Sequence, residues 1–111
     1  IISPDGSYRE LEMTGPLMST LGGAWQSKTT QVDPRDIVVL WTDGVTESRD
    51  AAGEELEESG LRSLIAKARA SGDVAPKQIV GKVLAASRSR AINWGNDDRT
   101  LIISAFGGQP N

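Results

Sequence analysis

The fold is decided by residues 36–48, whose sequence is Asp-Ile-Val-Val-Leu-Trp-Thr-Asp-Gly-Val-Thr-Glu-Ser. Five consecutive apolar residues, Ile37 to Trp41, predict a strand that is buried on both faces. The strand leads to Asp43, and Gly44 after it favours a sharp turn. An Asp-Gly pair by itself most often forms an ordinary turn. A carboxylate at the end of a rigid strand can also bind a metal or take part in catalysis, and residues further along the chain bear on that choice.

Composition limits the chemistry that this chain can perform. The chain has 111 residues, 38% of them hydrophobic and 24% charged, which is typical of one small globular domain or a part of one. It contains neither cysteine nor histidine. This excludes disulfides, thiolate nucleophiles, zinc–thiolate sites, Ser-His-Asp triads and phosphohistidine chemistry. Any catalysis must use carboxylates, hydroxyls, lysines or metal ions bound through oxygen.

Charge and hydropathy do not indicate a nucleic-acid or membrane partner. The net charge is −3, so no overall positive charge favours nucleic acid or an anionic lipid surface. No apolar run is long enough to span a bilayer, and no signal-peptide pattern is present, so we expect a cytoplasmic protein. The many basic residues between Arg62 and Arg90 are more typical of a solvated helix surface than of a binding face.

The residues before the central strand predict further strands. Residues 4–6 (Pro-Asp-Gly) favour a tight turn, and alternation over residues 7–13 predicts a β-hairpin with one arm truncated. Residues 25–32 predict a mostly polar strand. The turn at residues 33–36 would join that strand to the central one as an antiparallel pair.

Two amphipathic helices and a last strand follow the central strand. Apolar residues at helical spacing between Leu61 and Ala68 predict the first helix. Pro76 starts a second helix, whose predicted buried stripe runs from Ile79 to Ser87. Residues 99–106 predict the closing strand. This order of elements predicts an α+β fold with a mostly antiparallel sheet and a helix pair on one face.

Carboxylates are expected to converge at one edge of the sheet. Asp43 follows the central strand, and Asp97 and Asp98 precede the last one. If these strands are antiparallel neighbours, the exit of one lies beside the entry of the other. Clustered carboxylates repel one another, and a hard cation relieves the repulsion. Ligation by oxygen alone favours magnesium or manganese.

Three motifs occur in a fixed order along the chain: residues 36–48, Gly53-Glu54, and residues 97–103 (Asp-Asp-Arg-Thr-Leu-Ile-Ile). Together with residues 5–12 and 14–17, they resemble the PPM family of metal-dependent protein phosphatases. The resemblance is strongest to the bacterial SpoIIE/RsbU-like branch and covers essentially the whole chain.

The resemblance implies an α-β-β-α sandwich that hydrolyses phosphoserine or phosphothreonine on a regulatory protein of the anti-sigma-antagonist type. In that family two Mn²⁺ or Mg²⁺ ions activate a water that attacks phosphorus in line. The resemblance makes Asp43 and Asp97 metal ligands and places Asp98 at a position that usually binds no metal. Thr42 and Glu47 are candidates for supporting these ligands, and no residue of this chain is assigned a direct catalytic role.

The chain departs from the family pattern in its first half. The early glutamate and the Asp-Gly whose aspartate bridges both metals are absent, so residues 1–111 are expected to be a single partial domain, the C-terminal half of the catalytic domain. We expect this half to be inactive alone and to self-associate or to pair with the missing N-terminal half. The alternative is a non-catalytic, phosphatase-like or anti-sigma-antagonist-type interaction module, and the presence of both Asp43 and Asp97 favours the enzyme.

Overall fold

The computed structural model of this chain describes residues 1–70, 75–96 and 98–106. It confirms the predicted α+β class. The described helices and strands occur in the order β1 (Ile37–Trp41), α1 (Asp43–Thr46), α2 (Glu57–Arg69), α3 (Pro76–Arg90), the 3-10 helix η1 (Trp94–Asn96) and β2 (Leu101–Ala105).

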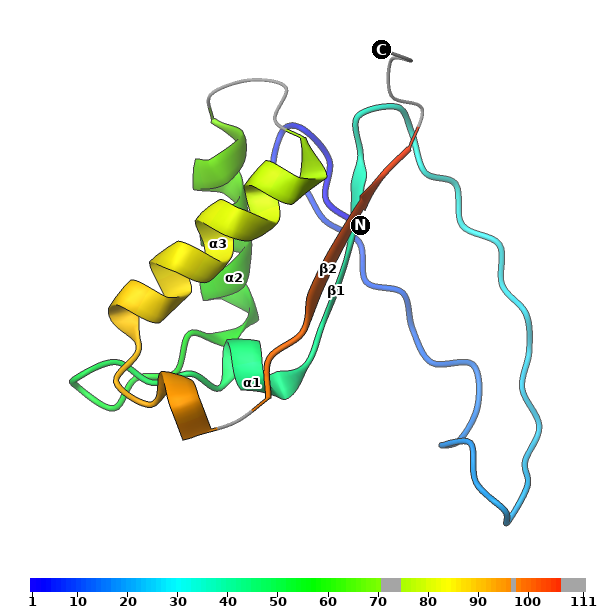
Figure 1. Cartoon of the computed structure of the whole chain (residues 1–111). Coiled ribbons are helices and arrows are strands. Elements are labelled where there is room, and N and C mark those ends of the chain that lie inside the picture. The colour runs from blue at the N-terminus through cyan, green and yellow to red at the C-terminus, as the bar shows by residue number, and fades with distance from the viewer. Residues whose placement is uncertain (71–74, 97, 107–111) are drawn as a thin grey trace.

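The central strand pairs with the last one, as the metal-site prediction requires. β1 and β2 lie antiparallel, in a register that places Ile37 opposite Ala105 and Trp41 opposite Leu101 (Figure 1). Both strands carry β-branched residues, which suit a pleated surface that is buried on one side. The end of β1 therefore lies beside the start of β2.

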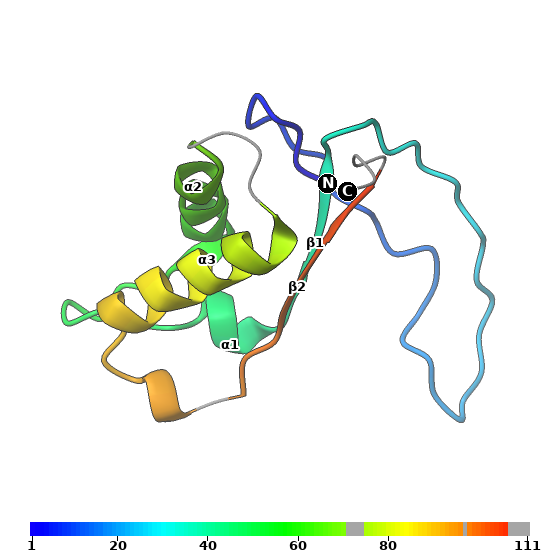
Figure 2. The same ribbon diagram turned by 45° about the horizontal axis from the view of Figure 1, so that its top comes forward.

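Helices α2 and α3 lie on the same side of this sheet (Figures 1 and 2). α2 begins with two glutamates, whose charges favour the positive end of the helix dipole, and α3 begins at Pro76, where the missing N–H costs no helix bond. No described helix is long and apolar enough to cross a membrane. The predicted apolar stripes are confirmed by the buried positions of the two helices, which are Leu61, Ile65 and Ala68 in α2 and Ile79, Val83 and Ser87 in α3.

The core lies between the helices and one face of the sheet. Ile37 and Val39 of β1 and Ile103 of β2 point into it. The prediction that β1 is buried on both faces is wrong. Leu40 is 56% exposed, and Ile102, its partner on β2, is 49% exposed. This face stays open because no second layer of described residues covers it.

The N-terminal hairpin is shorter than predicted. Ser3 N–H donates to the Ser7 carbonyl oxygen (2.9 Å), and Ile2 forms a single bridge with Tyr8. Ile1 and Arg9 exchange two further main-chain hydrogen bonds (2.8 and 2.9 Å), and the strand predicted over residues 7–13 does not continue beyond Arg9. Ile2 also pairs with Ile37 of β1: the Ile2 N–H donates to the Ile37 carbonyl oxygen (2.8 Å), and the Ile37 N–H donates to the Ile2 carbonyl oxygen (2.9 Å). The hairpin is therefore attached to the sheet through this residue.

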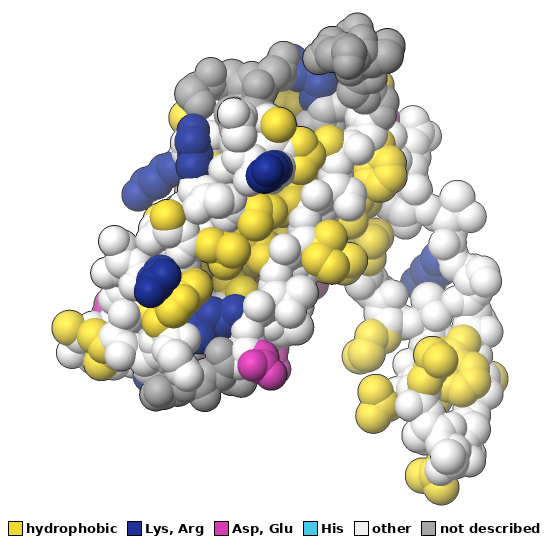
Figure 3. Space-filling view, in the orientation of Figure 1, with side chains coloured by type: hydrophobic (Ala, Val, Ile, Leu, Met, Phe, Trp, Pro, Cys, Tyr) yellow, Lys and Arg dark blue, Asp and Glu magenta, His cyan; other side chains and the backbone are white. Residues whose placement is uncertain are grey.

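The strand predicted over residues 25–32 is also absent. Residues 10–35 leave the core as an extended excursion (Figures 1 and 2). All side chains between Trp25 and Val32 are polar, so pairing this segment with β1 would bury little apolar surface. Figure 3 shows hydrophobic side chains that gather on the excursion. Its exposed large hydrophobic residues are Leu11, Met13, Leu17, Met18, Leu21 and Trp25.

Candidate functional site

The ends of β1 and β2 are tied together at the place predicted for the metal site. Thr42 N–H donates to the Thr100 carbonyl oxygen (3.1 Å), and Thr100 N–H donates to Thr42 Oγ1 (2.9 Å). Thr42 is thus held through both its main chain and its side chain. The pair fixes Asp43, the next residue, beside the loop that enters β2.

Asp43 begins α1 and does not lie in a turn, which corrects the sequence prediction. Its carbonyl oxygen accepts the N–H of Glu47 (2.8 Å), and this bond closes the single turn of α1. The three residues between them are buried, whereas Asp43 is exposed. Within the described part of the chain its carboxylate has no hydrogen bond or ion pair. The carboxylate is therefore open to a ligand from solvent.

Gly44 is needed because the main chain of another loop lies against it. It lies inside α1 and its φ is not positive, so the conformational freedom of glycine is not the reason for its presence. A Cβ at Gly44 would overlap the Asp98 carbonyl oxygen and lie 3.1 Å from Cγ of Arg99. A larger residue would push α1 away from the loop that carries Asp98. The glycine therefore allows Asp43 and Asp98 to lie on adjacent segments.

Arg99 holds the other side of this loop. Its Nη1 donates to the Trp94 carbonyl oxygen, and its Nη2 donates to the Asn93 carbonyl oxygen (3.0 Å). The guanidinium carbon lies 4.2 Å from the centre of a ring of Trp94, within the range of a cation–π contact. Arg99 thereby fastens η1 to the start of β2.

The same loop is attached to the segment that follows α1. Arg49 N–H donates to Asn93 Oδ1 (2.9 Å), and Ile92 N–H donates to the Arg49 carbonyl oxygen (2.9 Å). The Arg49 side chain donates to the Gly53 carbonyl oxygen and to Glu55 Oε1, both at 2.7 Å. The segment after α1 and the loop before β2 are therefore one connected unit of hydrogen bonds.

The carboxylates fit a hard divalent cation in kind but supply only part of a site. Asp97, the second predicted ligand, lies outside the described residues, and Asp98 is exposed. Among the described residues, no three His, Cys, Asp or Glu side chains come together as a metal site. Oxygen donors without nitrogen or sulfur match Mg²⁺ or Mn²⁺. Asp43 and one neighbour would leave most coordination positions to water or to other residues.

Some contributions to the site were not predicted from the sequence. Thr42 was a candidate support, and its Oγ1 does hold the entry of β2, whereas Glu47 is exposed at the end of α1. The sequence motif includes Arg99 without indicating its role, and the Asp-Gly pair predicts a turn at Gly44. The one local signal for Arg99 is an aromatic residue, Trp94, a few positions before it, and such a pair is too common to be specific.

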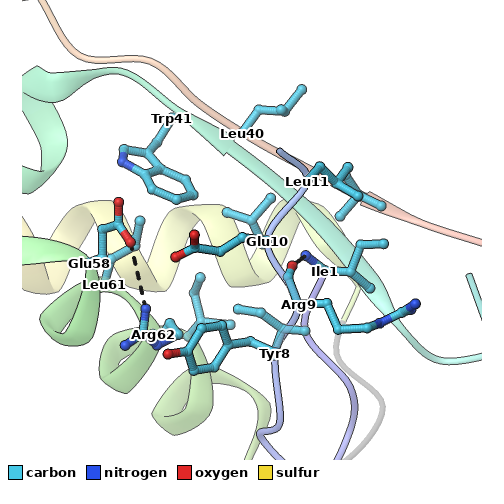
Figure 4. A pocket seen from close by; sticks show the side chains of 14 residues that line it. Ile1, Tyr8, Arg9, Glu10, Leu11, Leu40, Trp41, Glu58, Leu61 and Arg62 are labelled. Carbon is cyan, nitrogen blue, oxygen red and sulfur yellow. Dashed lines mark hydrogen bonds and ion pairs between the residues drawn. The ribbon is translucent and has the colours of Figure 1, made fainter. Parts of the chain in front are cut away.

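A separate groove of about 330 Å³ lies between residues 8–11, β1 and α2 (Figure 4). Arg62 occupies part of it: its guanidinium carbon lies 3.9 Å from the centre of the Tyr8 ring, and its Nη1 lies 3.9 Å from Glu58 Oε2. None of the predicted metal ligands lines this groove. The groove is therefore separate from the candidate metal site.

A comparison with known protein families identifies a relationship over most of the chain. The sequence model of the family described as Stage II sporulation protein E (SpoIIE) matches residues 1–106. No curated protein and no solved structure matches the chain. The family match includes all described helices and strands, and it spans the segments that carry Asp43 and Asp98.

Proposed function

This chain belongs to the Stage II sporulation protein E (SpoIIE) family of PPM-type phosphatases, and on that basis we propose that it serves the metal-dependent hydrolysis of phosphoserine or phosphothreonine on a protein. The observation that carries the proposal is the geometry at the end of β1. Asp43 is exposed there with no partner among the described residues, and Gly44 lies against the main chain of Asp98. The proposed setting is bacterial signal transduction in the cytoplasm.

In this proposal the chain holds part of a site for two Mn²⁺ or Mg²⁺ ions, with Asp43 and Asp97 as ligands. When bound, the ions would neutralise charge on the phosphoryl group and make the attacking water more acidic. The chain itself contributes position: Thr42 and Thr100 fix the direction in which Asp43 leaves β1. With no histidine or cysteine, it offers no imidazole or thiol to move a proton at neutral pH.

The proposed substrate is a phosphorylated regulatory protein of the anti-sigma-antagonist type. The exposure of Asp43 supports a macromolecular substrate, because a phosphorylated side chain on a protein surface can reach an open carboxylate but not a closed pocket. We further propose that the missing ligands come from residues outside these 111, in a companion half of the domain. A bound pair of ions needs more than the two aspartates assigned here.

A titration with Mn²⁺ tests both the activity and the ligand assignment. The complete phosphatase should hydrolyse a phosphoserine peptide only when Mn²⁺ or Mg²⁺ is present. Asp97→Ala should raise the Mn²⁺ concentration for half-maximal activity by roughly 100-fold or more. Mutation of residues that only hydrogen-bond to metal ligands already changes metal affinity by roughly 10- to 100-fold. Asp98→Ala should have a much smaller effect. Equal effects would move the ligand by one residue. Full activity in EDTA would contradict the metal dependence, and no activity with Mn²⁺ present would favour the non-catalytic module.

The open face of the sheet predicts how the chain behaves alone. Leu40 and Ile102 are exposed side by side on it, and exposed apolar sheet surface tends to find a partner. We expect the 111-residue chain to self-associate in light scattering, to form a stable complex when the companion half is added, and to show no phosphatase activity by itself. A monomer that hydrolyses the phosphoserine peptide with Mn²⁺ would contradict this prediction.

A further inference from the structure

We infer that Arg99 is a positioning residue, which sets the distance between the two sides of the metal site by clamping the loop before β2. The inference rests on the proposed function, and it concerns a residue that binds neither metal nor substrate. Arg99 immediately follows Asp97 and Asp98 in the sequence, but its side chain turns back along the chain. There it binds two carbonyl oxygens, those of Asn93 and Trp94.

The described residues before and after Asp97 are held in place. On the N-terminal side, the Arg99 guanidinium stacks on Trp94 at 4.2 Å and binds the carbonyl oxygens at the beginning of η1. On the C-terminal side, Thr100 N–H donates to Thr42 Oγ1. Between these two attachments, the Asp98 carbonyl lies against Gly44. These contacts hold the main chain at Asp98 against α1, whose first residue is Asp43.

An arginine is required for this contact, because its planar fork can reach two carbonyl oxygens while one face stacks on an aromatic ring. A lysine keeps the charge and most of the aliphatic stem, but it donates from a single point and stacks poorly. Arg99→Lys is therefore expected to leave the fold intact and to loosen the loop. Mutation of a residue that orients metal ligands without binding the metal typically weakens metal affinity by roughly 10- to 100-fold.

Arg62 provides a matched control. Its guanidinium carbon lies 3.9 Å from the centre of the Tyr8 ring, and it pairs with Glu58 at 3.9 Å, but its groove contains no predicted ligand. Arg62→Lys thus removes the same kind of stacked contact elsewhere in the domain. Any effect that comes merely from losing an arginine–aromatic stack should appear equally in both variants.

The experiment compares wild type, Arg99→Lys and Arg62→Lys in the complete phosphatase. Calorimetry measures Mn²⁺ binding directly, and phosphoserine-peptide hydrolysis is measured as a function of Mn²⁺ concentration. We expect Arg99→Lys to bind Mn²⁺ roughly 10- to 100-fold more weakly and to recover most of the wild-type kcat at saturating Mn²⁺. Arg62→Lys should match wild type in both measurements. A merely structural role would lower activity equally at all Mn²⁺ concentrations.

Each outcome either supports or overturns the positioning role. If wild type needs Mn²⁺ and Arg99→Lys binds it as tightly as wild type, the positioning role is wrong while the proposed function stands. If wild type needs no metal, the proposed function itself fails. Should Arg99→Lys not fold by circular dichroism, Arg99→Gln, which keeps a planar donor group, is judged by the same affinity criterion. An equal loss of affinity in Arg62→Lys would also overturn the inference.

Discussion

Replacing Asp43 by asparagine is expected to lower the kcat of the complete phosphatase by at least about 100-fold, while the midpoint of thermal unfolding changes by only a few degrees. The loss follows from the ligand role proposed for this carboxylate, because an amide keeps the shape but removes the charge that a hard cation needs. The fold should tolerate the change, since the Asp43 side chain is exposed and makes no hydrogen bond or ion pair with the described residues.

The chain contains its own control for this variant. Asp5 is also exposed and also precedes a glycine, but it lies in the N-terminal hairpin turn, where its carboxylate accepts the N–H and the hydroxyl of Ser7. Asp5→Asn should leave kcat and the Mn²⁺ requirement unchanged. Steady-state kinetics on both variants with Mn²⁺ present, together with thermal unfolding, makes the comparison. Near-normal turnover by Asp43→Asn would remove Asp43 from the site.

These two Asp-Gly pairs show where inference from the sequence reached its limit. Gly6 has a φ of 89° and nothing near the position of a Cβ, so it is a turn glycine. Gly44 lies in a helix and is needed because Asp98, which is distant in the sequence, approaches it. Local sequence describes the first case well, since the turn is made of adjacent residues. It cannot reveal the second, which depends on how β1 and β2 pair.

The predictions that were confirmed rest on strong local patterns. β1, β2 and the helices α2 and α3 all have clear apolar periodicity, and the strand ends met as antiparallel pairing requires. The prediction of strands over residues 7–13 and 25–32 was wrong. Alternation of polar and apolar residues forms a strand only if a partner strand and a covering layer are present. The excursion at residues 10–35 has neither among the described residues.

Arg99 illustrates a further limit. Its neighbours in the sequence, Asp98 and Thr100, gave no indication that the side chain would turn back toward η1. The contact depends on the path of the chain between α3 and β2, and this path is set by hydrogen bonds from Arg49 on the far side of α1. Tertiary contacts of this kind leave no periodic signal in a single sequence.

Truncating Ile65 to alanine should destabilise the domain by about 2–5 kcal/mol, far more than the truncation of an exposed side chain on the same helix. Ile65 has no exposed surface and lies in the stripe by which α2 faces the core. Removing its outer atoms would leave a cavity among side chains from the sheet and both helices, and a core of this size has little capacity to close it. Urea denaturation followed by circular dichroism gives the free energy, provided that the slope with denaturant is unchanged.

The neighbouring residue makes this prediction specific. Leu64 belongs to the same predicted stripe, but it is only partly buried at the margin of the core. Leu64→Ala should therefore cost clearly less than Ile65→Ala, although the leucine loses as many carbon atoms. Lys67, exposed on the same helix, serves as the surface reference, because Lys67→Ala changes neither the core nor helix propensity by much. If Leu64→Ala and Ile65→Ala lowered the free energy of unfolding equally, Leu64 would be as deeply buried as Ile65. Helix α2 would then be rotated about its axis relative to its orientation in the structure. If both resembled Lys67→Ala, α2 would not pack on the core at all.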